Sequence, residues 1–298
     1  MHIPAAIRPT EVRDTPPHWL HRIATAAVVV VLVIVASSAY LRQTSVRLNC
    51  PDWPACTQRA AGEDSARAQP AAVRAARLVH RLSASIAGAL VLLIAYLSSV
   101  QQPRVRADIA LSAALVVLTV FLAVLGRWSR SSQGPLVTLG NLLGGMTLLV
   151  LLHWMRLRTS PAHAAPEGAG RLAPVAGAAL ALALVAVSLG ALMSGSQAVS
   201  AARAASGGML ASAHLLSGML VLVLTGIVAL HPAVPGSGRN VGIVACALAI
   251  AQAMTGWIST RFDFPLAAAM AHNLLAALLL IALAAVAYRH IGSSSARL

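Results

Sequence analysis

Eight apolar runs of about 18 to 23 residues each constrain the fold of this 298-residue chain more than any other feature. A helix of about 20 residues spans the roughly 30 Å hydrocarbon core of a bilayer. Only 10% of the residues are charged, whereas soluble domains carry about 25%. The sequence therefore predicts an all-α integral membrane protein of eight transmembrane helices, near residues 23–41, 78–100, 109–126, 136–155, 173–193, 209–230, 241–258 and 266–288.

The orientation of the chain depends on its arginines and on two cysteines. The chain contains no lysine, and a cytoplasmic N-terminus would place eleven arginines on each side of the membrane, so the positive-inside rule does not decide. Cys50 and Cys56 share the first outer loop of that arrangement, and a disulfide between them would require an oxidising compartment. We therefore expect a multi-pass protein of a bacterial-type cytoplasmic (inner) membrane with its N-terminus in the cytoplasm.

The first apolar run and the net charge each allow a second reading. Ser37-Ser38-Ala39 could close a cleavable signal peptide, but seven further spans favour a retained signal-anchor. The net charge of +14 would suggest nucleic acid in a soluble protein. Here the arginines lie at the ends of apolar runs, where they contact anionic membrane groups. We expect no nucleic-acid partner.

The chain also resembles a duplication. A shared order of weak matches predicts two pseudo-symmetric four-helix bundles, each able to hold a cofactor in its core. We expect the chain to divide into a cytoplasmic N-terminal tail (1–22), an N-terminal bundle (23–160), a C-terminal bundle (161–288) and a cytoplasmic C-terminal tail (289–298). Chance similarity between Ala/Leu-rich helices is the alternative. The matched segments are His80-Arg81-Leu82-Ser83 with His214-Leu215-Leu216-Ser217, Gly126-Arg127-Trp128 with Gly256-Trp257, Pro135-Leu136 with Pro265-Leu266, and Asn141-Leu142-Leu143 with Asn273-Leu274-Leu275.

Four of the ten histidines fall inside the predicted spans. His80, His214 and His272 lie near the outer ends of helices that run from outside to inside, so they share a depth in the membrane. His153 lies at the inner end of its helix and cannot join them. Ionisable groups in spans are costly and usually functional, and imidazoles at matched depth on paired helices suit axial ligation of haem iron. A hydrogen bond to a neighbouring helix is the alternative for each.

The positions of the carboxylates argue against two classes of function. All eight fall in the predicted tails and loops: Glu11, Asp14, Asp52, Glu63, Asp64, Asp108, Glu167 and Asp263. A proton-coupled transporter generally needs an acidic residue within the membrane, and a zinc hydrolase would show a His-Glu-x-x-His pattern, which is absent.

Three arginines accompany His80 on its helix. Arg74, Arg77 and Arg81 follow one another at spacings of three and four, which places them on one helix face. Arginine binds carboxylates well, so Arg81 is a candidate contact for haem propionates. Snorkelling to lipid phosphates is the alternative.

These features together resemble the haem A synthase family of cytochrome oxidase assembly proteins. The similarity extends from about residue 23 to 288. It rests on Leu48-Asn49-Cys50-Pro51-Asp52-Trp53-Pro54-Ala55-Cys56, Val79-His80-Arg81-Leu82, Leu142-Leu143-Gly144-Gly145-Met146, Pro265-Leu266 and Ala271-His272-Asn273.

The resemblance implies a ligand set and partners. It implies two four-helix bundles with a histidine pair in each, and haem b held by the C-terminal pair, here His214 and His272. The N-terminal pair, of which His80 is one member, belongs to the site where haem O is oxidised at a ring methyl to give haem A. It also implies a disulfide between Cys50 and Cys56. The partners implied are a haem O supplier in the membrane, an electron donor, oxidase assembly factors and a possible second copy of the chain.

Two positions depart from the family. Arg77 stands where the family has Glu three residues before the helix 2 histidine, so a catalytic role for Arg77 is open. The family's helix 4 histidine maps to Asn141, or to Gly140 if the internal repeat is used. Three hypotheses follow: a haem A synthase with an unusual N-terminal site, a non-catalytic haem b protein for oxidase assembly or electron transfer, and a transporter.

Overall fold

The computed structural model describes residues 18–47, 70–101, 104–128, 135–160, 172–195, 200–231, 236–262 and 265–295. In these ranges the elements are long helices, each containing a stretch long and apolar enough to cross a bilayer. The prediction of an all-α integral membrane protein is confirmed. The helices are α1 (His18–Arg47), α4 (Ala71–Val100), α5 (Arg106–Trp128), α6 (Pro135–Arg158), α7 (Ala173–Gly195), α8 (Ser200–Leu230), α9 (Gly236–Arg261) and α10 (Leu266–Ser295).

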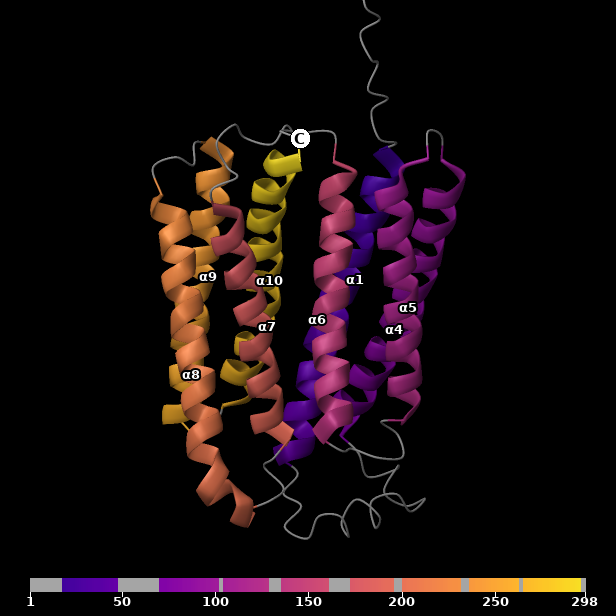
Figure 1. Ribbon diagram of the computed structural model, residues 1–298. Helices are drawn as coiled ribbons and strands as arrows, with labels where there is room; N and C mark the ends of the chain where they lie inside the picture. The colour runs from indigo at the N-terminus through magenta and orange to yellow at the C-terminus, as the bar shows by residue number, and fades with distance from the viewer. Residues whose placement is uncertain are drawn as a thin grey trace, which may run out of the picture.

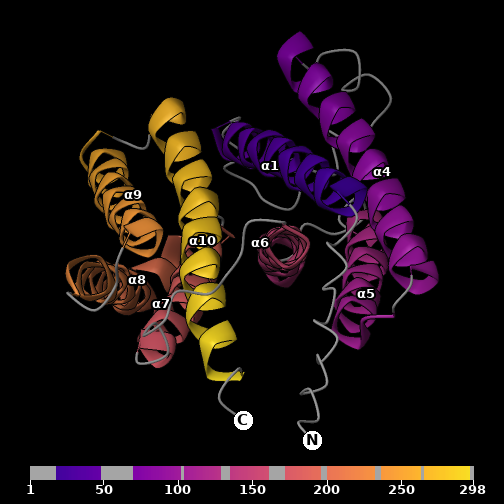
Figure 2. The ribbon, with the colours of Figure 1, turned by 90° about the horizontal axis from the view of Figure 1, so that it is seen from above.

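The helices pass up and down in two groups of four (Figure 1). In the first group α1 contacts α4, α4 contacts α5, α5 contacts α6, and α6 returns to α1. The second group closes in the same way, from α7 through α8 and α9 to α10 and back to α7. Seen from above, the second helix of each group lies diagonally opposite the fourth (Figure 2). We call the side where α4, α6, α8 and α10 begin, at the bottom of Figure 1, the lower face, and the opposite side the upper face.

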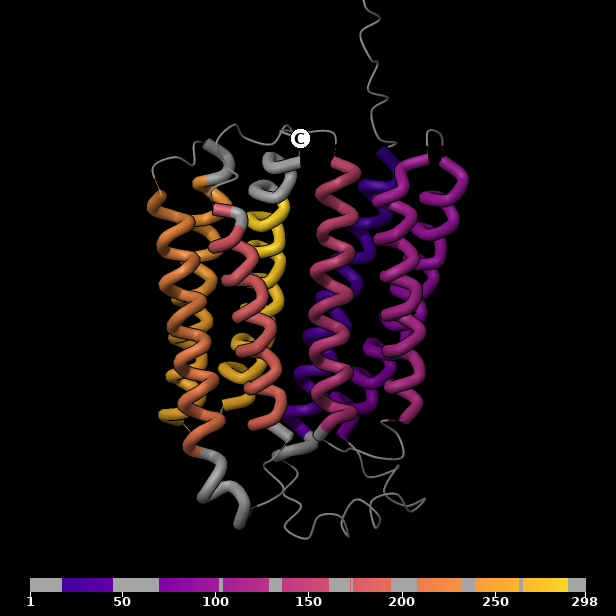
Figure 3. The backbone as a smooth tube through the Cα atoms, viewed as in Figure 1, coloured from indigo at the N-terminus to yellow at the C-terminus, as the bar shows by residue number. Residues whose placement is uncertain are grey.

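The best-buried part of the protein lies between the two bundles. There α10 contacts α1 and α6, and α6 contacts α7. Leu149 and Leu152 of α6 and Leu280 and Leu283 of α10 are almost fully buried. Half of the α10 span is buried, against 17% of the α5 span, so α5 mostly faces lipid. In Figure 3, α6 stands beside α1 at this interface.

Hydrogen bonds cross the interface toward each face. Trp154 Nε1 of α6 donates to the backbone oxygen of Ala284 on α10 at 3.0 Å. Arg42 Nη2 of α1 donates to Asn273 Oδ1 of α10, also at 3.0 Å. The two bundles are therefore joined by directed bonds in addition to apolar packing.

Several helices extend beyond the predicted apolar runs. The α4 helix begins at Ala71 rather than near residue 78, and α8 begins at Ser200 rather than near 209. Both extensions are rich in alanine, the residue with the highest helix propensity. Hydropathy reports only the part of a helix that lies in hydrocarbon, so the earlier starts were not visible to it.

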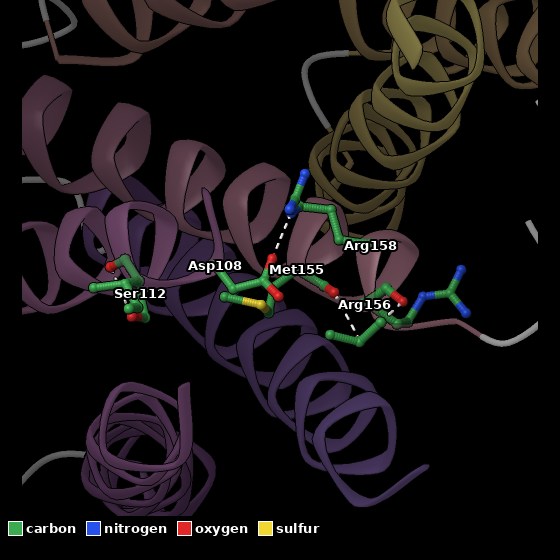
Figure 4. Close-up of polar contacts among 7 residues, drawn as sticks. Asp108, Ser112, Met155, Arg156 and Arg158 are labelled. Carbon is green, nitrogen blue, oxygen red and sulfur yellow. Dashed lines mark hydrogen bonds and ion pairs between the residues drawn. The ribbon is translucent and has the colours of Figure 1, made fainter. Parts of the chain in front are cut away.

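The expectation that Asp108 lies in a loop is wrong. It lies in the first turn of α5, is buried, and its Oδ1 accepts a hydrogen bond from Arg158 Nε of α6 at 2.6 Å. Figure 4 shows the two side chains directed toward one another. An acid in the first helical turn is favoured by the helix dipole, and the paired arginine offsets its burial. The other seven carboxylates lie outside the described residues.

Candidate functional site

His214 of α8 and His272 of α10 face one another across the C-terminal bundle. Their ring centroids are 6.2 Å apart, and the ring planes are inclined at 60°. Since α8 and α10 are the diagonal helices of this bundle, the two imidazoles meet near its axis. Both residues are half-buried. The sequence expectation that these two histidines share a depth agrees with this contact.

The α7 helix orients the ring of His214. Nδ1–H donates to the backbone oxygen of Ala186 at 2.9 Å. One helical turn further along α7 lies Gly190, where an added Cβ would lie 3.2 Å from His214 Cε1. The glycine lets the ring approach the helix backbone closely enough to make this bond.

The α9 helix orients the ring of His272 in the same way. Nδ1 lies 3.1 Å from the backbone oxygen of Gln252, and an added Cβ at Gly256 would lie 3.0 Å from His272 Cε1. Each histidine thus uses a carbonyl four residues before a glycine on the preceding helix. A carbonyl oxygen has two lone pairs. It can therefore accept a hydrogen bond from the imidazole N–H and also keep its hydrogen bond within the helix. The two histidines are therefore oriented by the same kind of contact.

This arrangement fits two axial ligands of one metal. When Nδ1–H donates this hydrogen bond, Nε2 of the neutral ring carries the free lone pair. Histidines that bind a metal usually donate their other ring N–H in this way. Two imidazoles that bind one ion from opposite sides at about 2.0 Å each have ring centres roughly 6 Å apart. Within the described ranges no group of three His, Cys, Asp or Glu could hold a metal. The pair therefore suits a metal whose remaining ligands come from a macrocycle.

Two further α9 side chains contact His272. Gln252 Nε2 lies 3.1 Å from His272 Nε2, and Thr255 Oγ1 lies 3.3 Å from His272 Nδ1. Sequence reasoning missed both of these residues and the glycine at 190. Gly256 did appear in the repeat match, and Gln252 could have been noticed as an amide within an apolar span.

His80 lies on α4, in the N-terminal bundle, and is half-buried. Arg77 and Arg81 are exposed on α4. The candidate roles of His80, Arg77 and Arg81 remain predictions.

The position diagonally opposite His80 is closed by apolar packing. A Cβ added at Gly140 of α6 would lie 2.7 Å from Leu125 Cδ2 and 3.9 Å from Phe121 Cζ, both on α5. Gly144, one turn later, meets Leu122 of α5 at the same 2.7 Å. In the C-terminal bundle the large side chain, His272, belongs to the fourth helix and the glycine to the third. In the N-terminal bundle this order is reversed, so a side chain added at Gly140 or Gly144 would first have to displace a leucine methyl group of α5.

The remaining predicted positions lie elsewhere. Asn141 is half-buried on α6, and His153 is buried on the same helix toward the upper face, whereas His214 and His272 lie nearer the lower ends of α8 and α10. Cys50 and Cys56 lie outside the described residues, and the disulfide between them remains a prediction.

The chain is similar to a protein family and to a curated protein. The family described as cytochrome oxidase assembly protein matches residues 18–215, which is 198 of the 298 residues. The heme A synthase of Shewanella oneidensis is 30% identical over 176 residues. That match covers 53% of this chain and 51% of the Shewanella protein, so the chain spans about half the length of the curated relative it matches.

Proposed function

The chain belongs to the family of cytochrome oxidase assembly proteins, and from this premise we propose that it acts in haem A formation. The predicted resemblance to haem A synthases is confirmed by the family match and the Shewanella relative. The reaction proposed is oxidation of the ring methyl of haem O to give haem A. The protein would work in a bacterial cytoplasmic membrane, with the upper face toward the cytoplasm.

The observation that carries the proposal is the 6.2 Å separation of the His214 and His272 rings. Their Nε2 atoms are the groups that would hold haem b, which would supply one-electron transfer when bound. The carbonyls of Ala186 and Gln252 hold each ring in the tautomer that can bind iron, as is usual for metal-binding histidines.

His80 is the proposed ligand on the substrate side, where haem O would bind. Arg81, exposed on α4 next to it in sequence, is the proposed contact for a propionate, since a guanidinium fork matches a carboxylate. Arg77 lies about one turn before His80. A guanidinium presents only hydrogen-bond donors, so we assign Arg77 anion binding rather than proton abstraction.

The test is haem A content in a host whose own synthase has been deleted. Expression of this chain with a source of haem O should restore haem A, and His80→Ala should abolish it. His272→Ala should remove the low-spin b-type spectrum of the purified protein. Absence of haem A with the wild-type chain would end the enzyme proposal.

A second candidate is a non-catalytic haem b protein that serves oxidase assembly or electron transfer. The residues at positions 140 and 141 of α6 favour it, because Gly140 and Asn141 stand where the family's helix 4 histidine maps. Under this alternative His214 and His272 still bind haem b, and haem A content is independent of His80. The same deletion host therefore separates the two candidates.

A further inference from the structure

The carboxamide of Gln252 makes an unusual contact with His272. Its Nε2 lies 3.1 Å from His272 Nε2, the nitrogen proposed above as an iron ligand. Its Oε1 is buried and has no hydrogen-bond partner among the residues that the structure describes. A buried amide oxygen without a partner is rare in a native protein.

The backbone fixes the direction of this hydrogen bond. A carbonyl oxygen can only accept, and that of Gln252 lies 3.1 Å from His272 Nδ1, so Nδ1 carries the proton. In the neutral ring Nε2 is then the acceptor, and the atom of Gln252 facing it must be the NH₂ group. Swapping the amide nitrogen and oxygen would place two acceptors against one another. The unpartnered Oε1 follows from this orientation.

His272 Nε2 has a single lone pair. A hydrogen bond from Gln252 and a bond to iron both use it, so they exclude one another. We propose that Gln252 is a displaceable cap on His272, which holds the imidazole in its binding tautomer and leaves when haem binds. Breaking this bond also releases Gln252 from a conformation in which its oxygen has no partner.

The cap acts before the iron bond forms, and this distinguishes it from an ordinary haem contact. Removing the cap should accelerate haem association and leave dissociation unchanged. A residue that contacts bound haem would, when removed, accelerate dissociation. The inference rests on the proposed binding of haem by His214 and His272.

The test uses the full chain in detergent or nanodiscs, in a His80→Ala background so that one site is measured. Gln252→Leu removes the amide and keeps similar volume, and the repeat places a leucine, Leu122, at the matching position of α5. Ferric protohaem is titrated and followed by its Soret band, and dissociation is measured by transfer to excess apomyoglobin. Metal-free protoporphyrin IX is the control ligand, because its binding needs no lone pair from His272.

We expect Gln252→Leu to tighten protohaem binding by about 3- to 10-fold, the usual net effect of one hydrogen bond. The whole change should lie in the association rate, and protoporphyrin affinity should be unchanged. Thr255→Val, which alters the Nδ1 side of the same ring, should not tighten protohaem binding. Faster dissociation, or equal tightening with protoporphyrin, would overturn the cap. If the parent chain shows no His272-dependent low-spin spectrum, the haem site itself fails, and the cap with it.

Discussion

The guanidinium of Arg42 on α1 donates a hydrogen bond to the amide oxygen of Asn273 on α10, with Nη2 and Oδ1 3.0 Å apart. Asn273 directly follows His272, and its Nδ2 donates to the backbone oxygen of Ala269 at 2.8 Å. The second bond fixes which end of the amide faces the arginine. A charged group of the N-terminal bundle is thus bonded one residue from a proposed ligand in the C-terminal bundle.

We expect this bond to couple the two bundles measurably. Arg42→Gln and Asn273→Leu should each lower the thermal stability of the purified protein. The pair should show a coupling free energy of about 1–2 kcal/mol, as a hydrogen bond to a charged group does. The measurement is a double-mutant cycle by thermal unfolding. The control replaces Arg261, an exposed residue at the end of α9. The stability losses of Arg261→Gln and Asn273→Leu should be additive. Additive stability losses for Arg42→Gln and Asn273→Leu would contradict the prediction.

Gly256→Ala should weaken haem binding, because the new Cβ would lie 3.0 Å from His272 Cε1 and would displace the ring from the Gln252 carbonyl. Overpacking of this kind costs about 1–2 kcal/mol, or roughly 5- to 30-fold in affinity. Protohaem titration measures it, with a shift toward high-spin haem. The matched control is Gly126→Ala at the equivalent place in the N-terminal bundle, where a Cβ meets nothing within 4 Å. Equal effects of the two substitutions would refute the steric explanation.

The N-terminal bundle should accept a second histidine only if space is made for it. Gly140→His alone should destabilise the protein by about 1–3 kcal/mol, because Leu125 Cδ2 already occupies the direction of its Cβ. Adding Leu125→Ala should restore stability and create a second low-spin haem that depends on His80. The readout is the haem-to-protein ratio with the reduced spectrum. A single Gly140→His variant with normal stability and a second haem would show that the leucine does not close the site.

The Asp108–Arg158 ion pair should stabilise the upper face. Side-chain exposures of 11% and 30% leave the pair partly screened by solvent. We therefore expect Asp108→Asn to cost about 1–2 kcal/mol rather than the larger value of a fully buried pair. Thermal unfolding of Asp108→Asn, Arg158→Gln and the double variant measures it. The double variant should lose less than the sum of the two single losses, and haem binding should be unchanged in all three. A strictly additive result would mean that the short contact contributes no stability.

Much of the fold followed from the sequence because the signals are local. The eight spans are visible from the lengths of apolar runs, and His214 and His272 could be matched in depth by counting residues from helix ends. Asp108 was misplaced because hydropathy cannot tell a loop from the first turn of a helix. The early starts of α4 and α8 were missed for the same reason.

What the sequence alone determined is therefore the number and order of the spans and the matched depth of His214 and His272. Only the tertiary structure decided which helix faces meet. It brought His214 against Gly190, His272 against Gly256 and Gln252, and Leu125 against Gly140. In a membrane helix the lipid-facing and protein-facing sides are both apolar, so periodicity along the chain does not reveal the rotation of a helix about its axis. That rotation is fixed by close packing and by hydrogen bonds between helices, and here it distinguishes a bundle with two facing imidazoles from a bundle filled by leucine.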